Sequence, residues 1–274
     1  FLPSLNLKYN LNDKNSLRLG ASKTYTLPQA KEISPYRYVG VNFNSQGNPN
    51  LKPSDHYNLD LKWDFNPTST ELISLTAFYK LIKNPISRIE VASAGGYLSY
   101  ENIADKATVA GVEVEIRKNL FVRPVSNAAH GMNKLSLGLN GSYIYTNAEM
   151  PLATVTTGSQ LEGAAPWIVN FDLSHNFTKG ERSFVNTLVL NYVSDKIYTI
   201  GTQGYQDMME QGVLTLDFVS QAKLNKHLSL NLKARNLLNP SYKLSRKANE
   251  NGEKVILNDY KKGINISLGV SCTF

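Results

Sequence analysis

The 274-residue sequence predicts an all-β protein, an antiparallel up-and-down transmembrane β-barrel. Three observations support this prediction. Apolar and polar residues alternate with a period of two over long stretches, which is the pattern of a strand with two unlike faces. Many of these stretches reach the roughly 9–11 residues that a tilted strand needs to cross a membrane. The segments that join them are alternately short and long, as in outer-membrane barrels.

The alternation is clear in the stretch HYNLDLKWDF, where Tyr57 and Leu59 are interleaved with Asn58 and Asp60. Successive side chains of a strand point to opposite faces, so this strand has one apolar and one polar face. The closing stretch GINISLGVSCTF repeats the pattern as far as Phe274. No segment has a convincing helical pattern, and the longest apolar runs are far shorter than the ~20 residues that a spanning helix needs.

Eleven strands are predicted, at residues 3–11, 16–24, 55–65, 71–83, 107–117, 134–147, 166–177, 183–197, 212–224, 227–237 and 260–274. The short connections NDKN, NPTST, TKGER and NK are rich in residues that form tight turns. Long connections are expected at 25–54, 84–106, 148–165, 198–211 and 238–259. Residues 119–133 fall where a short turn is due, yet we expect a longer connection there.

A soluble β-sandwich or solenoid would also alternate, and its strands average about 5–6 residues. The longer strands and the two classes of connection favour the barrel, whose apolar face contacts acyl chains. Its polar face lines an aqueous lumen. The charged residues predicted to face this lumen are Asp60, Lys62, Glu113, Glu115, Arg117, Lys233 and Arg235. Aromatic residues near strand ends are predicted to form the interfacial girdles, namely Trp63, Phe65, Tyr143, Tyr145, Trp167, Tyr192 and Tyr198.

Composition argues against several other classes of function. The net charge is +7, but the basic residues are scattered, so no nucleic-acid partner is expected. Cys272 is the single cysteine, and the four histidines have no metal-ligand spacing, so neither a disulfide nor a cofactor is predicted. Glu113 and Glu115 share a face with Arg117, which favours a lumenal ion pair over acid–base catalysis. The protein is therefore not expected to be an enzyme.

Several motifs resemble the barrels of TonB-dependent receptors, and they occur in that family's order. They are TYTLPQAKEISPY (24–36), GNPNLKPSDHYNLDLKWDF (47–65), ATVAGVEVEIRK (107–118) and LKARNLLNPSYKLS (232–245). The strand that ends in Phe274 resembles the signal that the barrel-assembly machinery of Gram-negative bacteria recognises.

The resemblance implies a barrel of 22 strands, of which this chain supplies about 11. Residues 1–274 would form the C-terminal half of the barrel, and the plug domain and the N-terminal strands would lie outside this chain. The implied partners are outer-membrane lipid, the rest of the same receptor, the TonB complex acting through the plug, and the barrel-assembly machinery. The implied location is the outer membrane of a Gram-negative bacterium.

The function that the resemblance implies is energy-coupled uptake of a scarce nutrient, either a small molecule or an oligomer. Iron chelates, vitamins, glycans and peptides all remain open as ligands. Ligand contacts are expected in the long connections, with candidates Tyr25, Tyr36, Arg37, Tyr38, Tyr97 and Tyr100. A passive outer-membrane channel, a surface adhesin barrel and a soluble β-protein are the alternatives.

Overall fold

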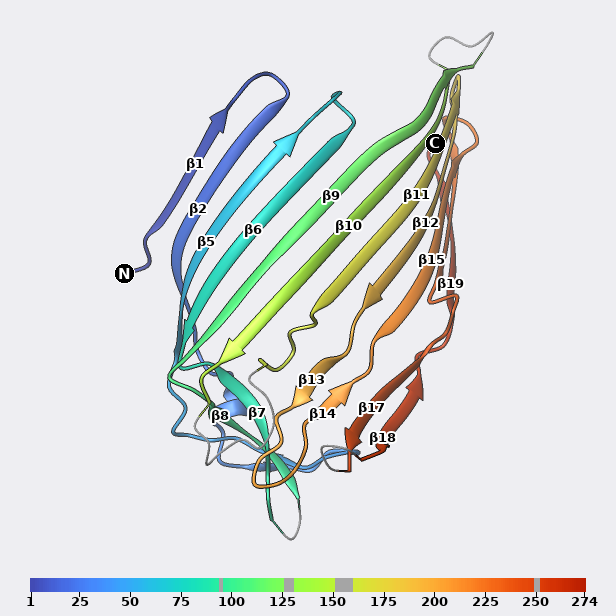
Figure 1. The fold of residues 1–274 in the computed structure, drawn as a ribbon. Helices are drawn as coiled ribbons and strands as arrows, with labels where there is room; N and C mark the ends of the chain where they lie inside the picture. Colours follow the sequence, from blue (N-terminus) through green and yellow to red (C-terminus); the bar gives the residue numbers. More distant parts are fainter. Residues whose placement is uncertain (94–95, 126–130, 151–159, 249–251) are drawn as a thin grey trace.

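The computed structural model describes residues 1–93, 96–125, 131–150, 160–248 and 252–274. Its main feature is an antiparallel sheet of eleven strands that curves into an open half-barrel (Figure 1). In spatial order the strands are β1 (Ser4–Asn10), β2 (Asn15–Thr26), β5 (Ser54–Phe65), β6 (Leu72–Lys83), β9 (Lys106–Pro124), β10 (Met132–Ala148), β11 (Trp167–Lys179), β12 (Arg182–Val193), β15 (Val213–Lys223), β16 (Leu228–Arg235) and β19 (Asn265–Cys272). This order follows the chain, so the predicted up-and-down arrangement is confirmed.

All eleven predicted strands are present, with three corrections at their ends. The strand predicted at 183–197 ends at Val193, and Lys196 begins a different sheet. The last strand begins at Asn265 rather than at residue 260. The connection predicted at 119–133 is shorter than expected, because β9 continues to Pro124 and β10 begins at Met132. Residues 126–130 of this connection lie outside the described residues. A register shift at Leu135/Ser136 lets β9 bend there and stay paired with β10.

Two smaller sheets are built from the long connections and lie at one end of the large sheet, which we call the loop end (Figure 1). One contains β13 (Lys196–Thr199), β14 (Met208–Glu210), β17 (Ser241–Lys247) and β18 (Lys254–Lys261). The other contains β3 (Arg37–Tyr38), β4 (Ser45–Gln46), β8 (Tyr97–Asn102) and β7 (Ile86–Val91). A single helical turn, α1 (Ala30–Ile33), precedes β3. No described helix is long and apolar enough to cross a membrane.

In the large sheet the apolar face is exposed and the polar face is buried, which is the reverse of the arrangement in a soluble protein. On the apolar face, Leu59 and Leu61 are 49% and 51% exposed, and no described element packs over this face. On the polar face, Asp64 and Ser74 are only 5% and 2% exposed. Side chains crowd together on the inner side of a curved sheet, so the polar face is the concave one and the apolar face is convex. An uncovered apolar face of this size requires an apolar solvent.

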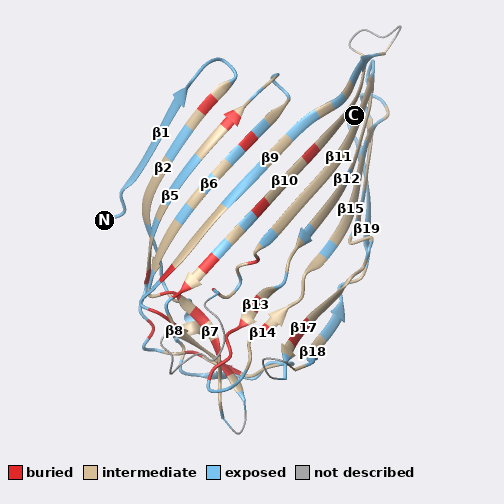
Figure 2. Ribbon diagram, viewed as in Figure 1, coloured by how far each residue is buried: buried red, intermediate tan, exposed pale blue. Residues whose placement is uncertain are grey.

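A hydrophobic cluster at the loop end, the loop-end core, joins the connections to the large sheet. Its buried members are Ile89, Ile103, Ala104, Ala107, Ala148, Leu161, Ile197 and Ile200. Ala107 and Ala148 are cross-strand partners in β9 and β10, and the others come from the connections. Figure 2 shows that buried residues gather where these connections meet the strands. The connections are therefore folded onto the concave side of the sheet.

Candidate ligand-binding site

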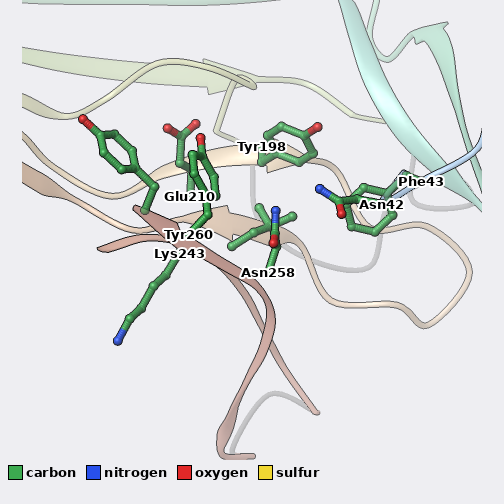
Figure 3. Close-up of a pocket in the computed structure, with 9 residues that line it drawn as sticks. Asn42, Phe43, Tyr198, Glu210, Lys243, Asn258 and Tyr260 are labelled. Carbon is green, nitrogen blue, oxygen red and sulfur yellow. The ribbon is translucent and has the colours of Figure 1, made fainter. Parts of the chain in front are cut away.

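A cavity of about 540 Å³ lies between the sheet that contains β17 and β18 and the segment around Phe43 (Figure 3). The residues that line it are Asn42, Phe43, Tyr198, Glu210, Tyr242, Lys243, Leu244, Asn258 and Tyr260. They come from three long connections that are far apart in the sequence. The cavity is thus a product of how the loop end folds.

One wall of the cavity is the β17–β18 hairpin. Tyr242 and Tyr260 are cross-strand partners, and their rings stack with centroids 5.5 Å apart. Leu244 and Asn258 form the next pair on the same face, because side chains in a strand alternate. The ammonium group of Lys262 lies 3.8 Å from the centroid of the Tyr242 ring. Two stacked phenol rings therefore form a pre-arranged aromatic surface.

Phe43 and Tyr198 form an aromatic pair on another side of the cavity, with ring centroids 6.4 Å apart. The guanidinium carbon of Arg88 lies 4.3 Å from the centroid of the Tyr198 ring. Arg88 also forms an ion pair with Glu162, at 3.1 Å, and donates its backbone N–H to the same carboxylate. Burial of Glu162 raises the pKa of its carboxyl group, even though Arg88 acts in the opposite direction. The Arg88–Glu162 ion pair therefore holds the guanidinium group in place against the ring of Tyr198.

A second ion pair ties the β17–β18 hairpin to β7. Arg246 in β17 contacts the carboxylate of Glu90 in β7, and both side chains are less than one fifth exposed. The Arg246 guanidinium also lies 5.3 Å from the centroid of the Tyr205 ring. The Thr202 hydroxyl donates to the backbone carbonyl of Glu90. These contacts fix the hairpin in position relative to the rest of the loop end.

The cavity offers aromatic faces, amide groups and one carboxylate. Glu210 is paired with Lys196 at 3.4 Å, and the side chain of Lys243 is directed away from the other lining residues (Figure 3). Such a lining suits a ligand with planar rings and hydrogen-bonding groups. Within the described residues, no group of three or more histidine, cysteine, aspartate or glutamate side chains is arranged to hold a metal ion.

A model of the family "TonB dependent receptor-like, beta-barrel" matches residues 1–237. The chain belongs to the TonB-dependent receptor family. This family consists of transporters and receptors of the outer membrane, so the predicted location in the outer membrane of a Gram-negative bacterium is confirmed.

Individual relatives agree with this assignment. The iron-regulated outer membrane virulence protein of Vibrio cholerae (serotype O1, El Tor) is 26% identical over 227 residues, which make up 79% of this receptor chain and 32% of that protein. A variant of the ferric enterobactin receptor of Pseudomonas aeruginosa, solved with enterobactin, matches with a TM-score of 0.61 at 18% identity. The copper transporter OprC matches with a TM-score of 0.66 at 14% identity. These two matches cover 100% and 99% of this chain and 40% of each solved chain, so the receptor chain spans less than half the length of its relatives.

The six ligand candidates from the sequence lie outside the lining of this cavity. Arg37 in β3 stacks on the ring of Tyr97 in β8, at 5.4 Å. Tyr100 is partly buried in β8, and its carbonyl accepts a hydrogen bond from Asn48. Tyr36 and Tyr38 are exposed in the 25–54 connection, 74% and 40% respectively, and Tyr25 lies on the convex face at the end of β2. Their role in binding remains a prediction.

The residues predicted to line the lumen lie on the concave face, as their register shows. Lys62 forms an ion pair with Asp64 at 3.4 Å, and Arg18 forms one with the same carboxylate at 3.3 Å. Arg117 pairs with Glu115 at 2.8 Å, and Glu113 occupies the same face one pair further along β9. On β16, Lys233 and Arg235 are the cross-strand partners of Ser267 and Asn265 in β19. Asp60 shares the concave row of β5 with Lys62.

The sequence did not identify the cavity residues. Tyr198 was assigned to an interfacial girdle, but it lies in β13, outside the large sheet. Tyr242 and Tyr260 occupy segments that the alternation left as connections, although the pairing of aromatic residues on a hairpin was a signal that could have been used. Phe274 is fully exposed beyond the end of β19, and its role in barrel assembly stays a prediction.

Proposed function

We propose that this chain forms the C-terminal part of the barrel of an energy-coupled outer-membrane receptor that takes up an iron chelate. The inverted packing of the large sheet supports a membrane-embedded barrel, and the family supports a transporter. The name of the Vibrio cholerae relative, an iron-regulated outer membrane protein, favours iron among the nutrients that the sequence left open.

The remaining strands and a plug domain would belong to the same receptor. β1 and β19 each have a neighbour on one side only within the described sheet. Unpaired backbone groups are too costly in hydrocarbon, so other strands must pair with both edges in the membrane. The implied plug would fill the lumen and connect the barrel to the TonB complex.

The cavity at the loop end carries the proposal for the ligand. Its stacked Tyr242 and Tyr260 rings and the nearby Phe43–Tyr198 pair would hold a chelate whose iron-binding groups are aromatic rings. Its amides would accept or donate hydrogen bonds at the edges of those rings. The cavity lies at the end of the barrel where ligand arrives from outside.

The test measures binding of a ferric tris-catecholate and of a ferric hydroxamate, which has no aromatic ring, to the purified receptor. We expect the Tyr242→Ala/Tyr260→Ala double variant to bind the catecholate about tenfold more weakly, since each lost aromatic contact is worth about 0.5–1.5 kcal/mol. Hydroxamate binding should change less. Lys261→Gln is the matched control, because Lys261 lies on the opposite face of the same hairpin and does not line the cavity.

Transport in cells separates this function from its alternatives. An energy-coupled receptor loses uptake when a protonophore collapses the inner-membrane proton gradient, whereas a passive channel keeps it and an adhesin shows none. Equal catecholate affinity in the double variant and in Lys261→Gln would reject the proposed cavity while leaving the receptor assignment intact.

A further inference from the structure

A second, smaller cavity of about 240 Å³ lies between the large sheet and the connections folded onto its concave face. On one side it is lined by Ser54 and His56, which belong to the concave row of β5. On the other side it is lined by Glu32 of α1 and by Glu162 of the connection between β10 and β11. None of the described residues that line it is a lysine or an arginine. We call it the acidic cavity.

The two carboxylates of the acidic cavity share a single counter-charge. Glu162 pairs with Arg88 at 3.1 Å, whereas Glu32 has no ion-pair partner among the described residues. One oxygen of Glu32 accepts the backbone N–H of Gln29 at 2.8 Å. Burial of Glu162 raises the pKa of its carboxyl group, and the nearby charge of Glu32 acts in the same direction. A cation that contacts both carboxylates would remove their repulsion.

The rest of the lining indicates what kind of cation fits. Ser87 is only 3% exposed, and no described residue forms a hydrogen bond with its hydroxyl group. Buried hydroxyl groups nearly always have a hydrogen-bond partner, so this one is available to a ligand. Ile82, Pro85 and Leu161 supply apolar surface beside it. A lining of this kind suits a charged group that donates hydrogen bonds and is carried on a short alkyl chain.

Arg88 links the acidic cavity to the larger cavity that contains the stacked tyrosines. One of its guanidinium nitrogens lies 3.1 Å from a carboxylate oxygen of Glu162. Its guanidinium carbon lies 4.3 Å from the centroid of the Tyr198 ring, which lines the larger cavity. A cation that shares Glu162 with Arg88 therefore lies one side chain away from the larger cavity. It could belong to a separate amine or to an arm of a molecule that occupies both cavities.

We propose that the acidic cavity binds a primary alkylammonium group, whose charge contacts Glu32 and Glu162 and whose alkyl chain packs against Ile82 and Leu161. The hydroxyl group of Ser87 accepts one of the ammonium N–H groups. The ammonium comes from a free alkylamine or from an amine arm on the chelate in the larger cavity. Only the second source rests on the function proposed above.

The first test measures binding of n-butylammonium and of neutral butyramide to the purified receptor by saturation-transfer NMR. Glu32→Gln is expected to raise the dissociation constant of n-butylammonium roughly tenfold, because it removes a charge-assisted hydrogen bond. The glutamine keeps an oxygen for the backbone N–H of Gln29, so α1 is retained. Glu149→Gln is the matched control, because Glu149 is an exposed carboxylate of the loop end that does not line the cavity. Heat-modified mobility in gel electrophoresis verifies that every variant is folded.

Two chelates separate the sources of the amine, namely a ferric tris-catecholate with one aminobutyl arm and the same chelate with a butyl arm. An arm that reaches the acidic cavity makes the first chelate bind about tenfold more tightly, and Glu32→Gln removes the difference. If the ligand is a free amine, the two chelates bind equally and n-butylammonium binds alone. The proposal is overturned if Glu32→Gln weakens neither n-butylammonium nor the aminobutyl chelate relative to Glu149→Gln, or if butyramide binds as tightly as n-butylammonium. Failure of both chelates to bind, with n-butylammonium still bound, would instead reject the larger cavity as the chelate site.

Discussion

At the scale of single residues, two glycines on neighbouring strands show how differently the two faces are packed. A Cβ atom on Gly111 of β9 would overlap the ring of Phe78 and lie 2.5 Å from the carbonyl oxygen of Tyr143. A Cβ atom on Gly141 of β10 would have no heavy atom within 4 Å. Gly111 belongs to the crowded concave face and Gly141 to the convex one.

Gly111→Ala should therefore lower the free energy of unfolding by about 1–3 kcal/mol, because the Phe78 ring and the adjacent strand must both move. Gly141→Ala should change it by less than about 1 kcal/mol. Urea titration of the receptor in lipid vesicles measures both variants. Similar effects at the two sites would contradict crowded packing on the concave face.

At the scale of elements, the β17–β18 hairpin depends on the ion pair between Arg246 and Glu90. Glu90→Gln leaves the guanidinium largely buried without a counter-charge, a situation that typically costs several kcal/mol. We expect amide hydrogen exchange in β17 to become at least about tenfold faster and the cavity to lose ligand affinity. In Glu90→Gln/Arg246→Gln no charge is left unpaired, so exchange should be slower than in the single variant. Faster exchange in the double variant would show that charge pairing is not what holds the hairpin.

The strands also show how much of the structure can be predicted from the sequence. Each strand of the large sheet has a long alternating pattern, because its two faces meet two different solvents along their whole length. The strands of the connections have two to eight residues and are packed in irregular surroundings, so no such pattern marks them. The cavity was beyond prediction for the same reason. Phe43, Tyr198 and Tyr260 meet only because separate connections fold together. Phe43 and Tyr198 pack against a second buried cluster, formed by Leu98, Met208 and Leu244.

At the scale of the whole molecule, the uncovered apolar convex face indicates that lipid, not water, surrounds the barrel. Leu59 is half exposed, and in a soluble protein its replacement by arginine would change stability little. In a bilayer, Leu59→Arg should cost about 2–4 kcal/mol. Thr76→Arg, on the concave face, should cost less because its side chain reaches the aqueous lumen. Folding efficiency into vesicles compares the two, and equal costs would argue against a lipid-facing convex surface.

The loop-end core has a consequence for how the receptor fails. Ile103 and Ile200 are buried from water, as in a globular protein, and a chaotrope weakens that kind of burial directly. The leucines of the convex face are surrounded by acyl chains instead. A mild chaotrope would therefore unfold the connections that form the cavity, while the strands of the large sheet stay in the bilayer. Such a preparation would keep the circular-dichroism spectrum of the folded barrel but would no longer bind the ligand.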